Sequence, residues 1–162
     1  MKRPVHSDPE PPARSGTKVQ ARTNDPERTM ADILAVATRE FAEKGLAGAR
    51  IDDIADAMRT SKRMIYYYFG SKEGLYIRVL EEAYRLIRSA ESDLHLDDLS
   101  PEDALRRLVG FTVDFQLTHP DFTRLVMTEN IHRGEYLARS QVIQGLNVPA
   151  IEGLHKVYER GL

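Results

Sequence analysis

The chain has 162 residues, of which 41% are hydrophobic and 30% charged, a length and balance that suit one helical domain or two small ones. It contains no cysteine, which excludes disulfides and thiolate metal sites and is compatible with a reducing compartment. The sequence has no apolar run of membrane-spanning length and no hydrophobic signal core near its start, so we expect a cytoplasmic protein without a membrane partner.

The net charge of −2 hides an uneven distribution along the chain. Residues 1–78 carry 14 lysines and arginines against 11 acidic residues, whereas residues 79–162 carry 9 against 14. The positive excess therefore lies in the first half of the chain. Such an excess is compatible with a surface that faces nucleic acid.

Residues 1–24 combine four prolines with scattered charge and only two large apolar residues after Met1. A segment of this composition cannot bury enough surface to offset its ordering entropy, so we expect a disordered N-terminal arm. Two interpretations stay open: a basic arm that follows DNA, or a solvated tail. The mixed charge favours the tail.

A first helix is expected from residue 26. Asp25 can cap it, Pro26 suits the first helical position, and Glu27 places an acid in the first turn. Gly45 is placed to end it. Apolar residues follow helical spacing between these limits, at Met30, Ile33, Leu34, Ala37 and Phe41.

Residues 51–69 contain two short helical patterns, separated by the polar turn at residues 59–61. Two short helices joined by a tight turn predict a helix-turn-helix. The second pattern, at residues 62–69, keeps two cations and two tyrosines off its apolar face, where they can reach phosphates or base edges. Tyr68 and Phe69 are the expected inward-facing pair.

The run S-K-R-M-I-Y-Y-Y-F-G-S-K-E-G-L-Y at residues 61–76, preceded by a helix that ends F-A-E-K-G, resembles the DNA-binding domain of the tetracycline-repressor (TetR) family. The resemblance covers about residues 29–80. It implies a homodimeric repressor that inserts the helix at residues 62–69 into the major groove of a palindromic operator in double-stranded DNA and is released by a small-molecule effector. Together with the polar and basic side chains that lie off the predicted apolar faces, the resemblance assigns DNA contacts to Arg50, Thr60, Lys62, Arg63, Tyr66, Tyr67 and Lys72.

Two positions depart from the family pattern. Arg50 stands where the family usually has serine or threonine, so the helix that follows is expected to lack a side-chain cap, although arginine can still reach a phosphate. Arg59 stands where glycine is common. If the turn requires a positive φ, Arg59 is mildly strained; otherwise it is a further cation near DNA.

Helical patterns continue to the end of the chain, and no strand pattern interrupts them. A fourth helix follows Ser71, a fifth follows Ser100, a sixth follows His119, and a seventh starts at Tyr136 and is expected to kink or break near Pro149. The predicted apolar face of the fifth helix is Leu105, Leu108, Val109, Thr112 and Phe115. We therefore predict an all-α fold.

The predicted domains are a helix-turn-helix DNA-binding domain at residues 25–72 and a helical effector-binding and dimerisation domain at residues 73–162. Because family members normally continue through two more long helices, we expect the second domain to be shortened at its C-terminus. Aromatic and polar residues suggest an effector pocket, with core packing as the alternative for each of them. The candidates are Phe111, Phe115, Phe122, Met127, Asn130, His132 and Tyr136.

A different class of protein is suggested by two Glu-x-x-His pairs, at residues 129–132 and 152–155, which form part of the signature of di-iron helical bundles. The alternative function is therefore a helical-bundle interaction or di-metal protein without operator binding. The helix-turn-helix signature is the more specific of the two. Because the sequence also lacks a phosphate loop, a nucleophile elbow and a zincin motif, we expect no enzyme activity, no catalytic or metal site and no cofactor.

Overall fold

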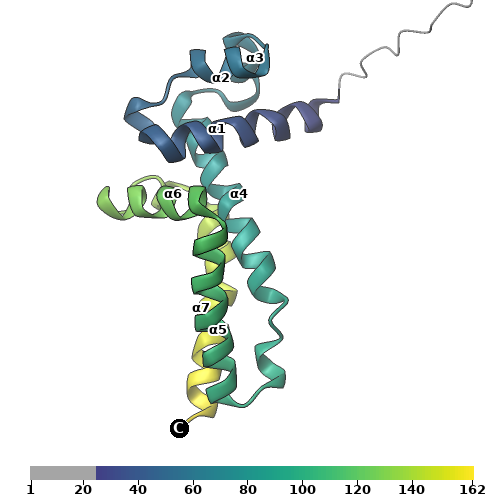
Figure 1. The fold of residues 1–162 in the computed structure, drawn as a ribbon, viewed down its shortest axis with the longest axis vertical. Coiled ribbons are helices and arrows are strands. Elements are labelled where there is room, and N and C mark those ends of the chain that lie inside the picture. Colours follow the sequence, from purple (N-terminus) through teal and green to yellow (C-terminus); the bar gives the residue numbers. More distant parts are fainter. Residues whose placement is uncertain (1–24) are drawn as a thin grey trace, which may run out of the picture.

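The computed structural model describes residues 25–162, which form α-helices and two short 3-10 helices and contain no strand, confirming the predicted all-α fold class (Figure 1). The predicted arm at residues 1–24 lies outside this range. None of the helices described is long and apolar enough to cross a membrane. The elements are α1 (Pro26–Gly48), α2 (Ile51–Met58), α3 (Lys62–Phe69), α4 (Lys72–Ser92), η1 (Leu96–Asp98), α5 (Pro101–Thr118), α6 (Pro120–Ile131), η2 (Leu137–Arg139) and α7 (Gln141–Arg160).

The helices form two regions joined by α4 (Figure 1). The first, here called the head, consists of α1, α2, α3 and the start of α4. The second, called the stem, consists of the rest of α4 with η1, α5 and α7, and α5 and α7 run side by side along it. α6 lies beneath α1 and packs against it. A single helix therefore connects the head to the far end of the stem.

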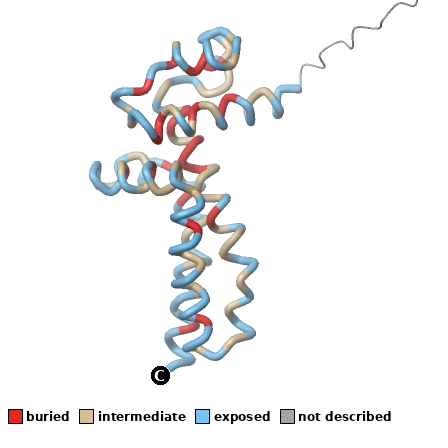
Figure 2. Tube along the Cα trace, viewed as in Figure 1, coloured by how far each residue is buried: buried red, intermediate tan, exposed pale blue. Residues whose placement is uncertain are grey.

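Most of the buried apolar core lies in the head and at its junction with the stem (Figure 2). Phe41 of α1 and Tyr76 of α4 pack edge to face there, with ring centroids 5.1 Å apart. The stem contributes few buried side chains, among them Ile87, Phe115 and Val157. The head is therefore a rigid support for α2 and α3, whereas the stem is more loosely packed.

The signals that limit α1 act as the sequence predicts. The Asp25 carboxylate accepts hydrogen bonds from the backbone N–H groups of Glu27 (3.1 Å) and Arg28 (3.3 Å), as an N-cap does. Gly45 interrupts the regular helix with φ of 64°, and its carbonyl accepts a bond from the N–H of Ala49. This backbone conformation is readily available only to glycine, so Gly45 turns the chain toward α2.

Helix α7 differs from its prediction, because it starts at Gln141 and runs through Pro149 without a break. Tyr136 instead precedes the short helix η2. A proline removes one backbone hydrogen bond from a helix, and packing on both sides can hold the remaining turns in place. Buried Ile143 and Val157 supply this packing on either side of Pro149.

Helix α5 also differs, because only part of its predicted apolar face is covered. Ala104 and Phe115 are buried, while Leu105 and Val109 are 49% and 56% exposed. The helix carries two apolar stripes, and the neighbouring helices cover only the one that contains Ala104 and Phe115. Periodicity alone could not decide which stripe is covered.

Candidate nucleic-acid interface

The two helices of the helix-turn-helix are held by buried apolar side chains and one side-chain cap. Ile54 of α2 and Ile65 of α3 are fully buried. Ser61 caps α3 by accepting a hydrogen bond from the N–H of Met64 at 3.3 Å. Arg50 gives α2 no side-chain cap, as expected, and its own N–H donates to the Glu40 carboxylate at 3.3 Å.

The turn between α2 and α3 requires the left-handed backbone region. Arg59 has φ of 54° and ψ of 41°, and the N–H of Thr60 closes the turn by donating to the carbonyl of Ala55 at 3.0 Å. This geometry selects the strained alternative for Arg59. The side chain is also exposed, so its charge lies on the surface beside α3.

The outer side of α3 is polar and exposed. Lys62 and Arg63 are exposed, and Tyr66 and Tyr67 are 43% and 79% exposed. Tyr68 and Phe69 are half-buried against the core of the head, and Ile65 is the fully buried residue of this helix. The arrangement leaves two cations and two tyrosines exposed on the surface of α3.

Ion pairs on this surface tie two of the cations to one acid. Asp52, in the first turn of α2, pairs with Lys62 through Oδ1, and its Oδ2 lies 3.7 Å from Nη2 of Arg50. Arg63, in contrast, forms no ion pair within residues 25–162. It is therefore the cation of α3 that has no acidic partner within that range.

Lys72 lies at the N-terminus of α4, and its Nζ is 3.5 Å from the carbonyl oxygen of Ala47. Ser71 caps this helix by accepting from the N–H of Gly74 at 2.9 Å. A Cβ on Gly74 would lie 2.2 Å from the carbonyl oxygen of Phe69, so only glycine lets α3 end this close to α4. The N-terminus of α4 thereby stays beside the recognition helix, with Lys72 on the same region of the head.

The sequence-predicted effector residues fall into separate places. Phe115 stacks on His119 (centroids 4.0 Å apart) and packs with Phe111 (5.6 Å) and Phe122 (5.2 Å), in a cluster that Tyr84 of α4 joins. Met127 and Asn130 are exposed. His132 and Tyr136 instead line a cavity of about 430 Å³ between the head and α6.

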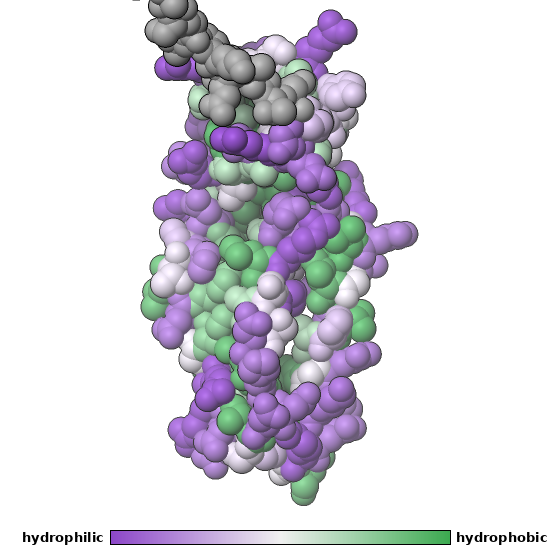
Figure 3. Space-filling view, turned by 90° about the vertical axis from the view of Figure 1, so that its right-hand side faces the viewer, coloured by the Kyte–Doolittle hydropathy of each residue, from purple (hydrophilic) through white to green (hydrophobic). Residues whose placement is uncertain are grey.

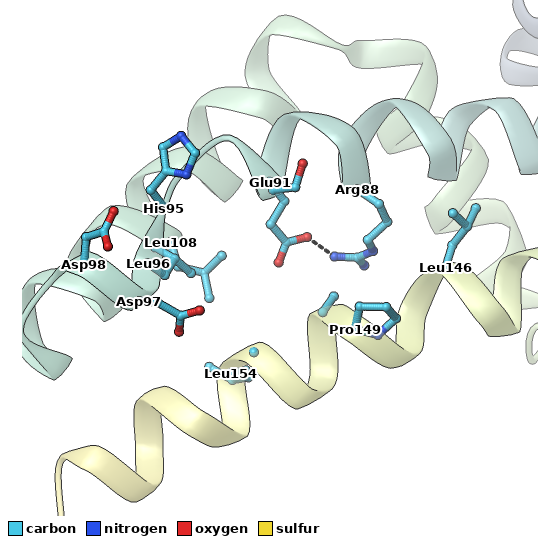
Figure 4. A pocket seen from close by; sticks show the side chains of 13 residues that line it. Arg88, Glu91, His95, Leu96, Asp97, Asp98, Leu108, Leu146, Pro149 and Leu154 are labelled. Carbon is cyan, nitrogen blue, oxygen red and sulfur yellow. Dashed lines mark hydrogen bonds and ion pairs between the residues drawn. The ribbon is translucent and has the colours of Figure 1, made fainter.

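A further cavity of about 410 Å³ opens in the stem, where α4 and α7 diverge (Figure 4). We call it the α4–α7 cavity. Arg88 spans it by pairing with Glu91 and donating from Nε to Oδ1 of Asn147 at 3.1 Å. None of the sequence-predicted effector residues lines it, because helix divergence leaves no mark in a sequence pattern. Its lining includes Arg88, Glu91, His95, Leu108, Leu146, Pro149 and Leu154.

Glu129, half of one Glu-x-x-His pair, has a structural role. It is 1% exposed and accepts hydrogen bonds from the Tyr76 hydroxyl (2.9 Å) and from the N–H groups of Tyr136 (3.1 Å) and Leu137 (3.2 Å). Burial raises the pKa of Tyr76, and the hydrogen bond to Glu129 raises it further. No group of three or more potential ligand side chains comes together in residues 25–162, so the di-metal alternative lacks a ligand set there.

The fold and this surface define a helix-turn-helix regulator, and comparison with known proteins identifies the family. Residues 33–79 match the family described as bacterial regulatory proteins, tetR family, and residues 101–162 match the tetracyclin repressor-like, C-terminal domain. The chain belongs to the TetR family, which confirms the resemblance found in its sequence.

Two curated relatives carry the name of repressor. The chain is 41% identical over 144 residues to the HTH-type transcriptional repressor NicS of Pseudomonas putida, an alignment that covers 89% of this chain and 68% of NicS. It is 36% identical over 110 residues to the HTH-type transcriptional repressor SCO4008 of Streptomyces coelicolor. That alignment covers 68% of this chain and 54% of SCO4008, so this chain spans about half of that relative.

Solved structures agree with this family. The putative transcriptional regulator SCO4942 from Streptomyces coelicolor is 33% identical, with a TM-score of 0.61 over 83% of this chain and 67% of that one. HlyIIR, a hemolysin II transcriptional regulator, is 28% identical, with a TM-score of 0.63 over 85% of this chain and 74% of that one. The arrangement of head and stem is therefore shared with transcriptional regulators.

Proposed function

We propose that this protein is a transcriptional repressor that binds a palindromic operator as a homodimer and leaves it when a small molecule binds. The observation that carries the proposal is the exposed polar side of α3, held on the packed core of the head. As a DNA-binding regulator, the protein needs no catalytic centre, and we assign it no enzyme activity.

In this proposal α3 enters the major groove. Arg63 is assigned to base edges or phosphates because no acid within residues 25–162 neutralises it. Lys72 is assigned to a phosphate at the edge of the groove, where the N-terminus of α4 also favours an anion. The complete proposed contact set is Arg50, Thr60, Lys62, Arg63, Tyr66, Tyr67 and Lys72.

The stem is the proposed dimerisation region. Leu105, Val109, Val113 and Leu117 form an exposed apolar stripe on α5. An open groove of about 960 Å³ between α5 and α7 is lined in part by Ile151, Leu154 and Tyr158. Figure 3 shows hydrophobic side chains gathered in the middle of one face of the molecule. Apolar surface of this extent is typical of a protein–protein interface.

Dimerisation matters because it sets the spacing of the two recognition helices. Half-sites about 34 Å apart place two such helices in successive major grooves. A ligand that binds a different dimer geometry more tightly would lower operator affinity, and the operator would lower ligand affinity by the same factor.

The α4–α7 cavity is the proposed effector site, because α4 leads from its lining to Lys72. Arg88 and Glu91 of α4 face this cavity, so a ligand there acts directly on the helix that begins beside the recognition helix. The aromatic cluster of Phe111, Phe115 and Phe122 is a second candidate wall. Met127, Asn130, His132 and Tyr136 complete the effector candidates proposed from sequence.

Titration of the protein onto DNA from its own upstream region, beside a scrambled duplex and at two salt concentrations, tests the proposal. We expect saturable, salt-sensitive binding that prefers the upstream DNA, with a dimeric mass by light scattering. The double variant Arg63→Ala, Lys72→Ala should lose roughly 100-fold in affinity if a base contact and a phosphate contact are both removed.

A matched control is the double variant Arg124→Ala, Arg139→Ala, which removes the same charge from exposed residues of α6 and η2, outside the stem and outside the assigned contact set. It should bind the upstream DNA within about threefold of the wild type, since long-range charge effects are screened. Full affinity of the Arg63, Lys72 variant would refute the assigned interface. Equal, weak binding of the wild type to both duplexes would refute the proposed function itself.

A further inference from the structure

We propose that Asp52 is a specificity-determining residue, whose carboxylate competes with DNA phosphates for Arg50 and Lys62 and so weakens binding to non-operator DNA more than binding to the operator. The inference rests on the proposed function. It concerns an acid that lies among the assigned DNA contacts without belonging to them.

The geometry places one carboxylate between two of the assigned cations. Asp52 lies in the first turn of α2, Arg50 precedes that helix, and Lys62 is the first residue of α3. The two oxygens of Asp52 are divided between the two cations, Oδ1 toward Lys62 and Oδ2 toward Arg50. The acid is therefore placed to compete with a backbone phosphate for both cations.

These pairs are open to exchange with an external anion. The side chains of Arg50, Lys62 and Asp52 are 70%, 53% and 40% exposed. Ion pairs this open to water are weak, so a phosphate can replace the carboxylate. The replacement nevertheless leaves the Asp52 charge close to the incoming phosphate, which disfavours the contact.

The cost falls mainly on non-specific binding. That binding arises almost entirely from cation–phosphate contacts, so each cation held by Asp52 is one contact fewer. At the operator, base contacts from other residues of α3, such as Arg63 and Tyr67, fix the depth of the helix in the groove. Arg50 and Lys62 are then positioned by these base contacts, so the competition from Asp52 lowers affinity for the operator by a smaller factor.

The test compares Asp52→Asn with the wild type on the upstream DNA and on the scrambled duplex, over a series of salt concentrations. We expect affinity for the scrambled duplex to rise roughly three- to tenfold, because two weak ion pairs are lost. The slope of log affinity against log salt should steepen there by about one to two, since each added phosphate contact contributes about 0.9. Affinity for the upstream DNA should change less than about twofold.

Asp53→Asn is the matched control. It removes the same charge from the neighbouring residue of α2, but Asp53 pairs with Lys44, at 3.0 Å, and Lys44 is not an assigned DNA contact. This variant should leave the preference for upstream DNA at the wild-type value. When Lys62→Ala is also present, Asp52→Asn can release only Arg50. Its gain in affinity for the scrambled duplex should then be smaller than the gain that it brings in the wild type.

The outcomes separate this inference from the proposed function. A wild-type protein without preference for the upstream DNA refutes the proposed function, whatever Asp52→Asn does. If the wild type has the preference, an equal gain on both duplexes, a loss on both, or no change for Asp52→Asn overturns the inference alone. An equal effect of Asp53→Asn also overturns it, because net charge would then be the cause.

Discussion

Replacing Glu129 by alanine should destabilise the protein by about 3–5 kcal/mol, because three hydrogen-bond donors lose their acceptor. The Tyr76 hydroxyl is the most costly of them, since Tyr76 is only 1% exposed. The N–H groups of Tyr136 and Leu137 are only partly buried and recover some hydration. Each buried donor left without a partner costs about 1–3 kcal/mol, so three donors cost about 3–9 kcal/mol, and the partial hydration places the loss in the lower half of that range.

Urea unfolding followed by circular dichroism measures this loss, and two further variants locate it. Glu129→Gln keeps the shape: its amide oxygen can accept from the two backbone N–H groups, and its amide N–H can donate to the Tyr76 oxygen. Only the Tyr76 O–H then loses its acceptor, so this variant should cost about 1–3 kcal/mol, less than Glu129→Ala. Tyr76→Phe should cost about 1–2 kcal/mol in the wild type and much less when Glu129→Ala is already present. A loss below about 1 kcal/mol for Glu129→Ala would refute the hydrogen-bond argument.

Three further predictions concern the backbone and the pH dependence of stability. Arg59→Gly should raise the free energy of unfolding by about 0.5–1 kcal/mol because it relieves the positive φ, whereas Arg59→Ala should not, and equal effects would contradict the role of strain. Pro149→Ala should raise the melting temperature, because it restores a backbone hydrogen bond and removes the crowding of the proline ring inside α7. The two effects together are worth about 1–3 kcal/mol, and an unchanged melting temperature would count against this account. Burial raises the pKa values of Tyr76 and Tyr84 in the folded protein. The folded state therefore keeps protons that the unfolded state loses above about pH 10, so stability is complete below that pH and falls as pH rises. Tyr76→Phe should make this fall shallower in a series of urea titrations at alkaline pH, and an unaltered slope would be evidence against it.

The helix-turn-helix could be predicted from sequence because its determinants are local. Ser61 caps α3, the apolar residues of α2 and α3 recur at helical spacing, and the limits of α3 agree with those predicted. Gly45 ends the regular part of α1 for an equally local reason. Caps, turns and apolar periodicity each depend on residues close together in the chain, so they can be recognised in the amino-acid sequence.

The roles of Tyr76 and Glu129 could not be predicted, because the two residues meet only after folding. They are 53 positions apart in the chain and 2.9 Å apart in space. Without that contact, Glu129 fitted the spacing of a metal-ligand pair, and Tyr76 was absent from the predicted core. The α4–α7 cavity escaped prediction for the same reason, since its walls come from four separate elements.

The path from the stem to the DNA interface depends on how α4 is held along its length. Its upper part, residues 72–81, contains five buried residues, Leu75, Tyr76, Val79, Leu80 and Glu81. Glu81 accepts a hydrogen bond from the hydroxyl of Ser140, just before α7 (2.7 Å). In the lower part, residues 82–92, Ile87 is the one buried residue.

The lower part of α4 is linked to α7 by the polar contact between Arg88 and Asn147, beside the α4–α7 cavity. Polar contacts across a cavity can exchange partners without exposing new apolar surface, whereas an interlocked apolar core cannot. Under the proposed function, a ligand that replaces the Asn147 amide as the partner of Arg88 would shift the lower part of α4. Because the upper part moves with the head as one packed unit, that shift would reach Lys72 as a rotation of the whole head.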